Sequence, residues 1–341
     1  MKKTLIALML LGWTACYAQN PIVKNHFTPD PAPYVHGKKV YMFADHDEDK
    51  PNDYFHMKEW LLYESKDMVN WKPLGKDGVI FDLTIFKWAK QGDDAWAGQL
   101  IERNGKWYAY VTATDQARHI QGIGVAMADR PEGPYIDPIG KPIVPGSWGY
   151  IDPSVFIDDD GQAYLFWGNN ALWYAKLNED MVSLGSEIIQ VETESEEAFG
   201  PKKMKRDYQL NKQVLKTNYE EAPWVYKRNG IYYLVYAAGG VPEHMAYSTS
   251  NSINGPWKYQ GRIMNESENS FTIHGGIINF KGHDFIFYHN GKIPGDGVLP
   301  KGGGFNRSAC IEEFEYNSDG SIPLIPFTEG ITKPIKKKKS K

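Results

Sequence analysis

The sequence predicts an all-β protein that folds as a single five-bladed β-propeller. Five short segments share one pattern, in which an acidic or polar position is followed by a turn or an apolar pair and then by a strand-like run. The segments are Asp30-Pro31-Ala32-Pro33, Ala95-Trp96-Ala97-Gly98, Asp152-Pro153-Ser154-Val155, Glu221-Ala222-Pro223-Trp224 and His274-Gly275-Gly276-Ile277. Their first residues are 65, 57, 69 and 53 positions apart. Loose self-similarity at this period in a β-rich sequence is typical of radially arranged blades.

Each segment begins a predicted β-hairpin. The turn that follows the first strand is a dipeptide ending in Gly, as in short hairpin turns: His36-Gly37, Asn104-Gly105, Asp160-Gly161, Asn229-Gly230 and Lys281-Gly282. Aromatic and aliphatic runs then predict second strands at 39–43, 106–111, 163–167, 231–236 and 283–288. We expect third strands at 62–65, 124–128, 172–175 and 245–248, and fourth strands at 70–73 and 255–258.

The remaining segments define the domain organisation. No stretch longer than about two helical turns has an apolar period of 3.6 residues. Residues 192–213 are polar and charged, which predicts an insertion between the third and fourth blades. The propeller is therefore expected to fill residues 25–330 without a second domain, followed by a solvated, Lys-rich tail at 331–341.

The N-terminus has the pattern of an export signal. Lys2 and Lys3 precede an apolar run, and small residues follow up to Ala18, so residues 1–18 are predicted to be a removed signal peptide. Lipoprotein anchoring through Cys16 is the alternative. No later apolar run reaches the ~20 residues of a spanning helix. We expect an exported protein, periplasmic or extracellular, whose mature chain retains only Cys310 and has no intrachain disulfide.

Composition and charge limit the classes of partner. Six of the 38 basic residues lie in the final Lys-rich tail and two more in the leader, which leaves 30 against 42 acidic residues. A protein body this acidic argues against nucleic-acid binding, which needs a basic face. Aromatic residues make up 14% of the chain, which suits strand packing and also stacking on sugar rings.

Three of the five repeated segments begin with a carboxylate residue, namely Asp30, Asp152 and Glu221. Equivalent positions of different blades converge at one face of a propeller, so these acids are expected to meet. Crowded carboxylates raise one another's pKa, which lets one stay protonated as a general acid while another stays ionised as a base. Hydrolysis of glycosidic bonds requires this division. Any one of the three acids alone would be an ordinary turn or loop residue.

The chain resembles glycoside hydrolase family 43 over nearly the whole mature sequence. Three motifs carry the resemblance: Thr28-Pro29-Asp30-Pro31, Ile151-Asp152-Pro153-Ser154-Val155-Phe156 before Asp158-Asp159-Asp160-Gly161, and Glu221-Ala222-Pro223-Trp224. The last departs from the usual motif at Ala222 and Trp224 but keeps the Glu in register. The resemblance implies Asp30 as the general base, Glu221 as the general acid and Asp152 as the residue that tunes and orients Glu221. It also implies inversion, with Asp30 and Glu221 ~6.5–9.5 Å apart.

Four further residues are candidates for the site, two of them through the resemblance. His274 resembles a channel histidine that helps to hold a hydrated metal ion, for which Ca²⁺ is suited, although a hydrogen-bonded structural His is the alternative. Arg307 resembles a substrate-contacting arginine, with a surface ion pair as the alternative. Trp96 would form an apolar wall beneath the sugar or belong to the core, and Asn169 would bind a sugar hydroxyl. No cofactor is expected for the chemistry itself.

We considered three other classes. A sialidase-like propeller is suggested by Ser65-Lys66-Asp67-Met68-Val69-Asn70-Trp71, but no blade opens with the arginines that such a site needs. A non-catalytic carbohydrate-binding propeller would not need the three acids together, and a structural scaffold would not explain them.

The sequence therefore predicts a monomeric, exo-acting glycosidase acting on arabinose- or xylose-containing glycans. We prefer an α-L-arabinofuranosidase, with β-xylosidase and then endo-arabinanase as alternatives. The loops at 45–60, 192–213 and 292–304 are expected to wall the mouth of the site.

Overall fold

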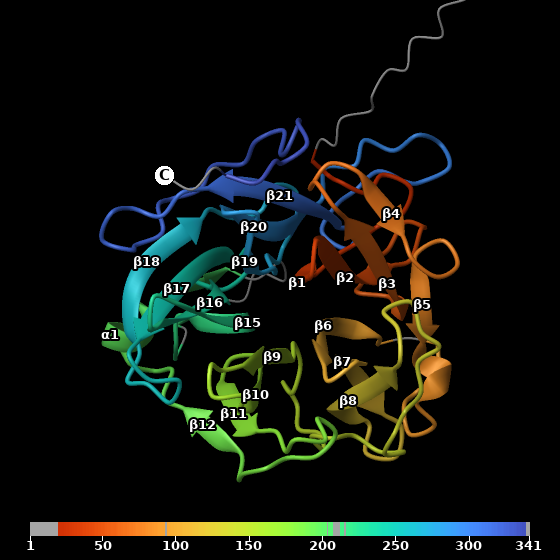
Figure 1. Ribbon diagram of the computed structural model, residues 1–341, viewed down its shortest axis with the longest axis horizontal. Coiled ribbons are helices and arrows are strands. Elements are labelled where there is room, and N and C mark those ends of the chain that lie inside the picture. The colour runs from red at the N-terminus through yellow and green to blue at the C-terminus, as the bar shows by residue number, and fades with distance from the viewer. Residues whose placement is uncertain (1–19, 93, 203, 207–211, 215, 339–341) are drawn as a thin grey trace, which may run out of the picture.

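The structure is a computed structural model that describes residues 20–92, 94–202, 204–206, 212–214 and 216–338. Five antiparallel sheets are arranged radially about a central axis, which confirms the predicted five-bladed β-propeller (Figure 1). The expected signal peptide and Cys16 lie outside the described residues. Within the described ranges, no helix has both the length and the apolar character needed to cross a membrane.

The blades follow one another in chain order around the ring. From the axis outward, the first blade contains β1 (Ala32–His36), β2 (Lys39–Asp47), β3 (Met57–Ser65) and β4 (Trp71–Pro73), and β5 (Val79–Asp82) also pairs with β3. The second blade contains β6 (Trp96–Arg103), β7 (Lys106–Asp115) and β8 (Ile120–Ala128). The third blade contains β9 (Ser154–Ile157), β10 (Ala163–Trp167), β11 (Leu172–Lys176) and β12 (Ile189–Val191). The last two contain β15 (Tyr219–Arg228), β16 (Ile231–Ala238), β17 (His244–Ser250) and β18 (Lys258–Met264); and β19 (Ile277–Phe280), β20 (His283–Asn290) and β21 (Ser308–Phe314).

Three of the five predicted turn dipeptides join their strands as predicted, namely Asn104-Gly105, Asn229-Gly230 and Lys281-Gly282. In the first blade His36 still belongs to β1 and the turn is Gly37-Lys38, and in the third blade the connection spans residues 158–162. Asn104, Asn229 and Lys281 have φ of 54°, 50° and 56°, and the Gly after each also has a positive φ. Two successive left-handed residues match the twist of the flanking strands, and Asn and Gly adopt this conformation at low cost. The predicted second and third strands lie inside observed strands. One predicted outer strand was misplaced, because β18 begins at Lys258, where the expected strand at 255–258 ends.

The ring is closed by the segment before β1, which lies beside the last strand of blade five. The N–H of Ile22 donates to the carbonyl of Ala309 at 2.8 Å, and the N–H of Thr28 donates to the carbonyl of Arg307 at 3.0 Å. The side chain of Asn20 also accepts from the N–H of Ile311 at 2.9 Å. The two ends of the propeller sequence therefore share one sheet edge.

Apolar side chains fill the space between neighbouring blades. The ring of Trp107 packs at right angles to that of Tyr34 on the adjacent blade, with centroids 5.9 Å apart. Trp224 links the fourth and fifth blades, since its indole N–H donates to the carbonyl of Ile277 at 3.1 Å. These contacts hold the inner strands in fixed positions around the axis.

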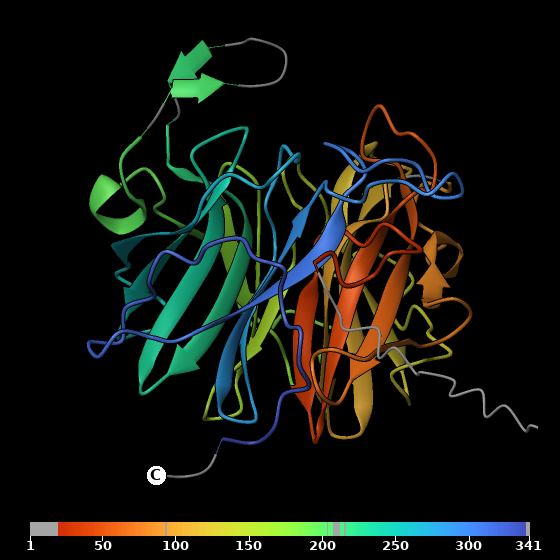
Figure 2. The same cartoon turned by 90° about the horizontal axis from the view of Figure 1, so that it is seen from above.

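The predicted insertion between the third and fourth blades is present. It contains the short helix α1 (Glu196–Phe199) and a hairpin of β13 (Met204–Arg206) and β14 (Lys212–Val214). Figure 2 shows this hairpin projecting away from the five blades.

The Lys-rich C-terminal segment was expected to be solvated, and its described part differs from that prediction. The N–H of Ile335 donates to the carbonyl of Asp67 at 2.9 Å, and the N–H of Lys338 donates to the carbonyl of Lys281 at 2.9 Å. Ile331 is buried among apolar residues of the first and fifth blades. The many lysines of this segment predict a solvated tail, but the groups that hold it against the propeller are two isoleucines and backbone amides.

This anchoring predicts a stability effect for a residue that looks like part of a tail. Ile331→Ala removes a side chain that is only 8% exposed, so the free energy of unfolding should fall by about 2–3 kcal/mol. Leu324→Ala, at a position that is 55% exposed, is the matched control and should change it by less than about 0.5 kcal/mol. Denaturant titration measures both, and equal effects would contradict the anchored segment.

Candidate active site

All seven residues predicted for the site line one cavity of about 280 Å³ at the axis. The cavity lies where the inner strands begin, so side chains far apart in the sequence meet there. The seven residues are Asp30, Trp96, Asp152, Asn169, Glu221, His274 and Arg307. The structure therefore brings together the complete set of predicted site residues.

The backbone before each inner strand positions the acids. Asp30 and Asp152 have φ of 52° and 59°, a left-handed conformation that Asp tolerates better than most residues. At the fourth blade the left-handed residue is Ala222, with φ of 56°, immediately after Glu221. The pairing of β15 with β16 shifts register between Glu221 and Trp224, which is a β-bulge. Bulges of this kind re-aim side chains next to active sites.

Asp30 is buried beside two positively charged or hydrogen-bonding groups. Its Oδ1 lies 3.1 Å from Nη1 of Arg307 and 3.2 Å from Nδ1 of His289. Burial by itself would raise the pKa of Asp30, but the guanidinium of Arg307 and the imidazole of His289 hold this pKa well below its usual range. Asp30 is therefore ionised at neutral pH.

Arg307 was expected either to contact substrate or to form a surface ion pair. Its side chain is only 3% exposed, and Nε and Nη2 form a bidentate pair with Asp47 at 3.0 and 2.9 Å. Nη1 also donates to Thr272 Oγ1 at 3.2 Å, and the guanidinium lies 4.7 Å from the ring centroid of Phe55. The structure therefore contradicts the surface alternative and shows a buried ion pair that borders the cavity.

Glu221 lies in the opposite electrostatic environment. Burial and the charge of the adjacent Glu220 raise the pKa of Glu221 to about 7. The side-chain amide of Asn169 donates to Oε2 of Glu221 at 2.5 Å, which favours the ionised form and opposes this rise. A carboxyl group with this pKa is partly protonated at neutral pH and can donate a proton.

Asp152 connects the two sides of the cavity. Its Oδ2 accepts the N–H of Ala222 at 3.0 Å, and its own N–H donates to Thr112 Oγ1 at 3.1 Å. Burial and the charge of Glu221 raise the pKa of Asp152 well above its usual value. Because Ala222 directly follows Glu221, this hydrogen bond fixes the backbone that carries the Glu221 side chain.

His274 lies between two of the acids. Its Nδ1 is 3.6 Å from Asp30 Oδ1 and 4.0 Å from Asp152 Oδ2. Burial lowers the pKa of His274 to about 4, so the ring is neutral at neutral pH and keeps a lone pair for a ligand. One neutral imidazole beside carboxylate oxygens is a donor set that fits a hard cation whose remaining ligands are water.

Aromatic side chains form the walls of the cavity. Trp96 donates its indole N–H to the carbonyl of Phe55 at 3.1 Å, and both residues line the cavity. Trp148 also lines the cavity and is 74% exposed, so a large apolar ring is open to a ligand. Of the three loops expected to wall the mouth, only 45–60 contributes lining residues within the described part of the chain.

Several buried polar residues around the site were not predicted from the sequence. Asp45 and Asp47 on β2 are fully buried, and His289 on β20 is fully buried beneath Asp30. Glu243 and Gln121 also line the cavity. The one available signal was Asp45-His46-Asp47, which places charged residues in a strand that is otherwise apolar. The other residues lie in ordinary strand or loop contexts that the sequence does not distinguish.

The chain is similar to known glycosidases over most of its length. The profile of glycosyl hydrolases family 43 matches residues 18–322. The chain is 30% identical to a xylosidase/arabinosidase 43A of Humicola insolens, over 89% of this chain and 98% of that protein. It is also 30% identical to a xylosidase/arabinosidase of Bacteroides ovatus, over 89% of this chain and 96% of that protein.

A similar solved structure is that of a GH43 beta-xylosidase/alpha-arabinofuranosidase from a compost microbial metagenome, in complex with xylotriose and in a calcium-free form. It matches with a TM-score of 0.72 and 28% identity, over 90% of this chain and 97% of that one. The chain thus belongs to glycosyl hydrolases family 43, as its motifs predict, and is a glycosidase that hydrolyses O-glycosyl bonds.

Proposed function

We propose that this protein is an inverting, exo-acting α-L-arabinofuranosidase that also releases β-linked xylose. The observation that carries the proposal is the division between Asp30 and Glu221 in one cavity. The pKa of Asp30 is held well below its usual range, whereas burial raises that of Glu221 to about 7. The names of the relatives include both xylosidase and arabinosidase, which supports a pocket that accepts either pentose.

In the proposed reaction, Asp30 and Glu221 act on opposite sides of the scissile bond. The Asp30 carboxylate accepts a proton from water as the water oxygen bonds to the anomeric carbon. Glu221 gives its proton to the glycosidic oxygen as the bond to the anomeric carbon breaks, so the leaving group departs as an alcohol. Asp30 ends protonated and Glu221 ionised, and solvent exchange restores both. A separation of about 6.5–9.5 Å between the two carboxyl groups would leave room for the water.

The shape of the site supports action at a chain end. A volume of about 280 Å³ is just below the range of about 300–1,000 Å³ that ligand pockets commonly span. Trp96 and Trp148 offer apolar surfaces for a sugar ring. Asn169 donates a hydrogen bond to Glu221 and lines the cavity, so its amide could also bind a hydroxyl of a sugar placed there.

No cofactor enters the proposed proton transfers. His274 would hold a hydrated Ca²⁺ or similar cation together with neighbouring acids, and the ion would supply fixed positive charge to the carboxylates. The residues of this chain perform both proton transfers in the scheme above.

The function is tested with four substrates and the purified chain. Nitrophenyl α-L-arabinofuranoside and nitrophenyl β-D-xyloside rank the two sugars, and arabinan and xylan distinguish monosaccharide release from internal cleavage. We expect free arabinose and xylose, with the arabinofuranoside cleaved faster. Oligosaccharides as the first products would instead indicate endo-arabinanase action. If the protein binds these substrates but hydrolyses none of the four, it would instead be a non-catalytic carbohydrate-binding propeller.

The acid and base roles predict different responses to the leaving group. Glu221→Gln should slow cleavage of an unactivated disaccharide by about 10²–10⁴-fold, because the leaving alkoxide then departs without a proton. The loss should be much smaller with a nitrophenyl leaving group, which needs little protonation. Asp30→Asn should remove activity on both substrates, because water attack is needed for each. Equal losses for Glu221→Gln on the two substrates would exclude Glu221 as the acid.

The pH profile of kcat/KM should report the protonation of Glu221. Because Glu221 must be protonated to act, kcat/KM should fall as the pH rises through about 7. Because Asp30 stays ionised in acid, kcat/KM should stay high as the pH falls below neutral. Asn169→Ala removes a hydrogen bond to the ionised form of Glu221 and should move the alkaline limb to higher pH. Asn279→Ala, on an exposed part of β19, is the control and should leave the limb unchanged. A shift to lower pH in Asn169→Ala would contradict the assignment.

A further inference from the structure

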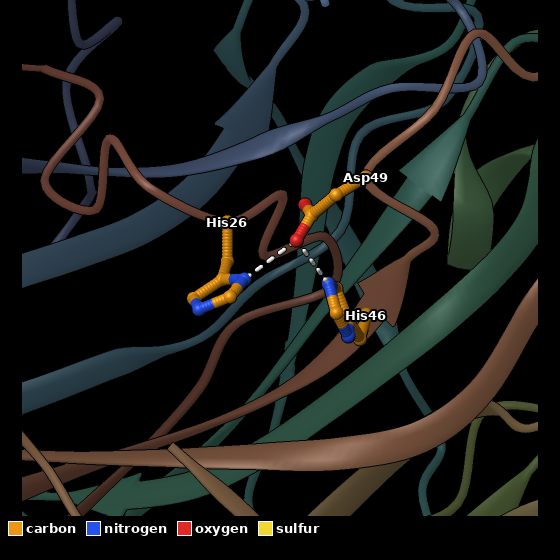
Figure 3. Close-up of side chains that lie close together, drawn as sticks. All are labelled: His26, His46 and Asp49. Atoms are coloured by element: carbon orange, nitrogen blue, oxygen red, sulfur yellow. Dashed lines mark hydrogen bonds and ion pairs between the residues drawn. The ribbon is translucent and has the colours of Figure 1, made fainter. Parts of the chain in front are cut away.

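A second cluster of ligand-type side chains lies outside the active-site cavity. It consists of His26 in the segment before β1, His46 on β2 and Asp49 in the loop after β2 (Figure 3). Asp49 Oδ2 is 2.6 Å from Nδ1 of His26 and 3.2 Å from Nε2 of His46. Figure 3 shows the carboxylate directed between the two imidazole rings. None of the three residues lines the active-site cavity.

The tautomer of His46 is set by a fourth residue. Glu59 on β3 lies with Oε1 2.9 Å from Nδ1 of His46, so Nδ1 carries a proton that it donates to Glu59. Nε2 is then the atom that faces Asp49; it is buried and makes no hydrogen bond within the described part of the chain. Metal-binding histidines commonly donate one ring N–H to a carboxylate in this way, which orients the ring and leaves the other nitrogen for the metal.

Asp49 is oriented in a similar way. Its Oδ1 accepts the N–H of Phe27 at 3.2 Å, which leaves Oδ2 to face the two histidines. A carboxylate oxygen this close to a ring nitrogen requires a proton or a metal ion between the two atoms. Two carboxylates, those of Asp49 and Glu59, lie against His46, and their negative charge favours a cation at the cluster.

We propose that His26, His46 and Asp49 bind one divalent transition-metal ion, with zinc as the best match. Two imidazole nitrogens and a carboxylate oxygen form a common zinc ligand set, and water would fill the fourth position. Tetrahedral zinc, at about 2.0–2.1 Å from each ligand, sets ligand atoms about 3.3 Å apart. The 3.2 Å between His46 and Asp49 already matches, and the 2.6 Å between His26 and Asp49 has to widen by less than an ångström.

The position of the cluster gives the ion a structural consequence. His26 belongs to the segment that closes the ring against β21, whereas Asp49 belongs to the loop that carries Phe55. Phe55 lines the active-site cavity and packs against the guanidinium of Arg307. A metal ion at the cluster would therefore join the ring closure to a wall of the active site.

The test compares zinc binding by four tag-free forms of the full chain after treatment with a chelator. Wild type should bind one more equivalent of zinc in isothermal titration calorimetry than His26→Gln, which lacks a ligand. Glu59→Gln should weaken binding at that site by about 10–100-fold, because it removes the carboxylate that orients His46. His36→Gln, at an exposed histidine elsewhere on the first blade, is the matched control and should bind as wild type. Zinc held by the active site would be common to all four.

Two further readouts separate metal binding from misfolding. Circular dichroism of the metal-free proteins should be the same for all four forms. Cobalt added in place of zinc should give the visible absorption of a tetrahedral site in wild type and lose it in His26→Gln. The proposal is overturned if wild type and His26→Gln bind the same number of zinc ions with the same affinity, since the cluster would then hold only protons.

Discussion

The active site depends on one buried guanidinium, that of Arg307. Among the described residues that line the cavity, Arg307 is the only Lys or Arg, and it faces several acids. Its bidentate pair with Asp47 fixes the group, and its remaining amino group points at Asp30. A buried charge that loses its partner costs about 3–5 kcal/mol, so these contacts are held firmly. The charge of Arg307 and the contacts of His289 outweigh burial at Asp30, whereas at Glu221 burial and the charge of Glu220 outweigh the opposing effects of Asn169 and Arg307, which is why the pKa values of the two acids differ.

The fold makes this pairing by joining the two ends of the chain. Arg307 directly precedes β21, and its carbonyl accepts the N–H of Thr28, two residues before Asp30. The hydroxyl of Thr28 in turn accepts the N–H of Ala309 at 3.1 Å. The base and the residue that keeps it ionised are therefore aligned by the same backbone pairing that closes the propeller. Glu221 is positioned independently, through the bulge in β15 and the contact of Ala222 with Asp152.

The sequence predicted the fold and the acids because both repeat. Gly-containing turns before aromatic strands recur in every blade, and Asp30, Asp152 and Glu221 occupy related positions in three of them. Single, non-repeated contacts were not predictable. Asp47 and His289 look like strand residues, and their role appears only when distant strands meet. Likewise, Ile331 and Ile335 anchor a segment whose composition indicates a solvated tail. Burial and partner choice arise from tertiary packing, which local patterns do not encode.

The central claim is that one ring of carboxylates contains a base that is ionised and an acid that is partly protonated at neutral pH. Carbon-13 NMR titration of labelled Asp and Glu carboxyl groups tests it directly, with Glu221→Gln and Asp30→Asn used to assign the signals. The account predicts a Glu221 carboxyl that titrates near pH 7 and an Asp30 carboxyl that stays ionised well below the ordinary range of Asp. A Glu221 signal that titrates like an exposed Glu, or an Asp30 that is protonated at neutral pH, would contradict it.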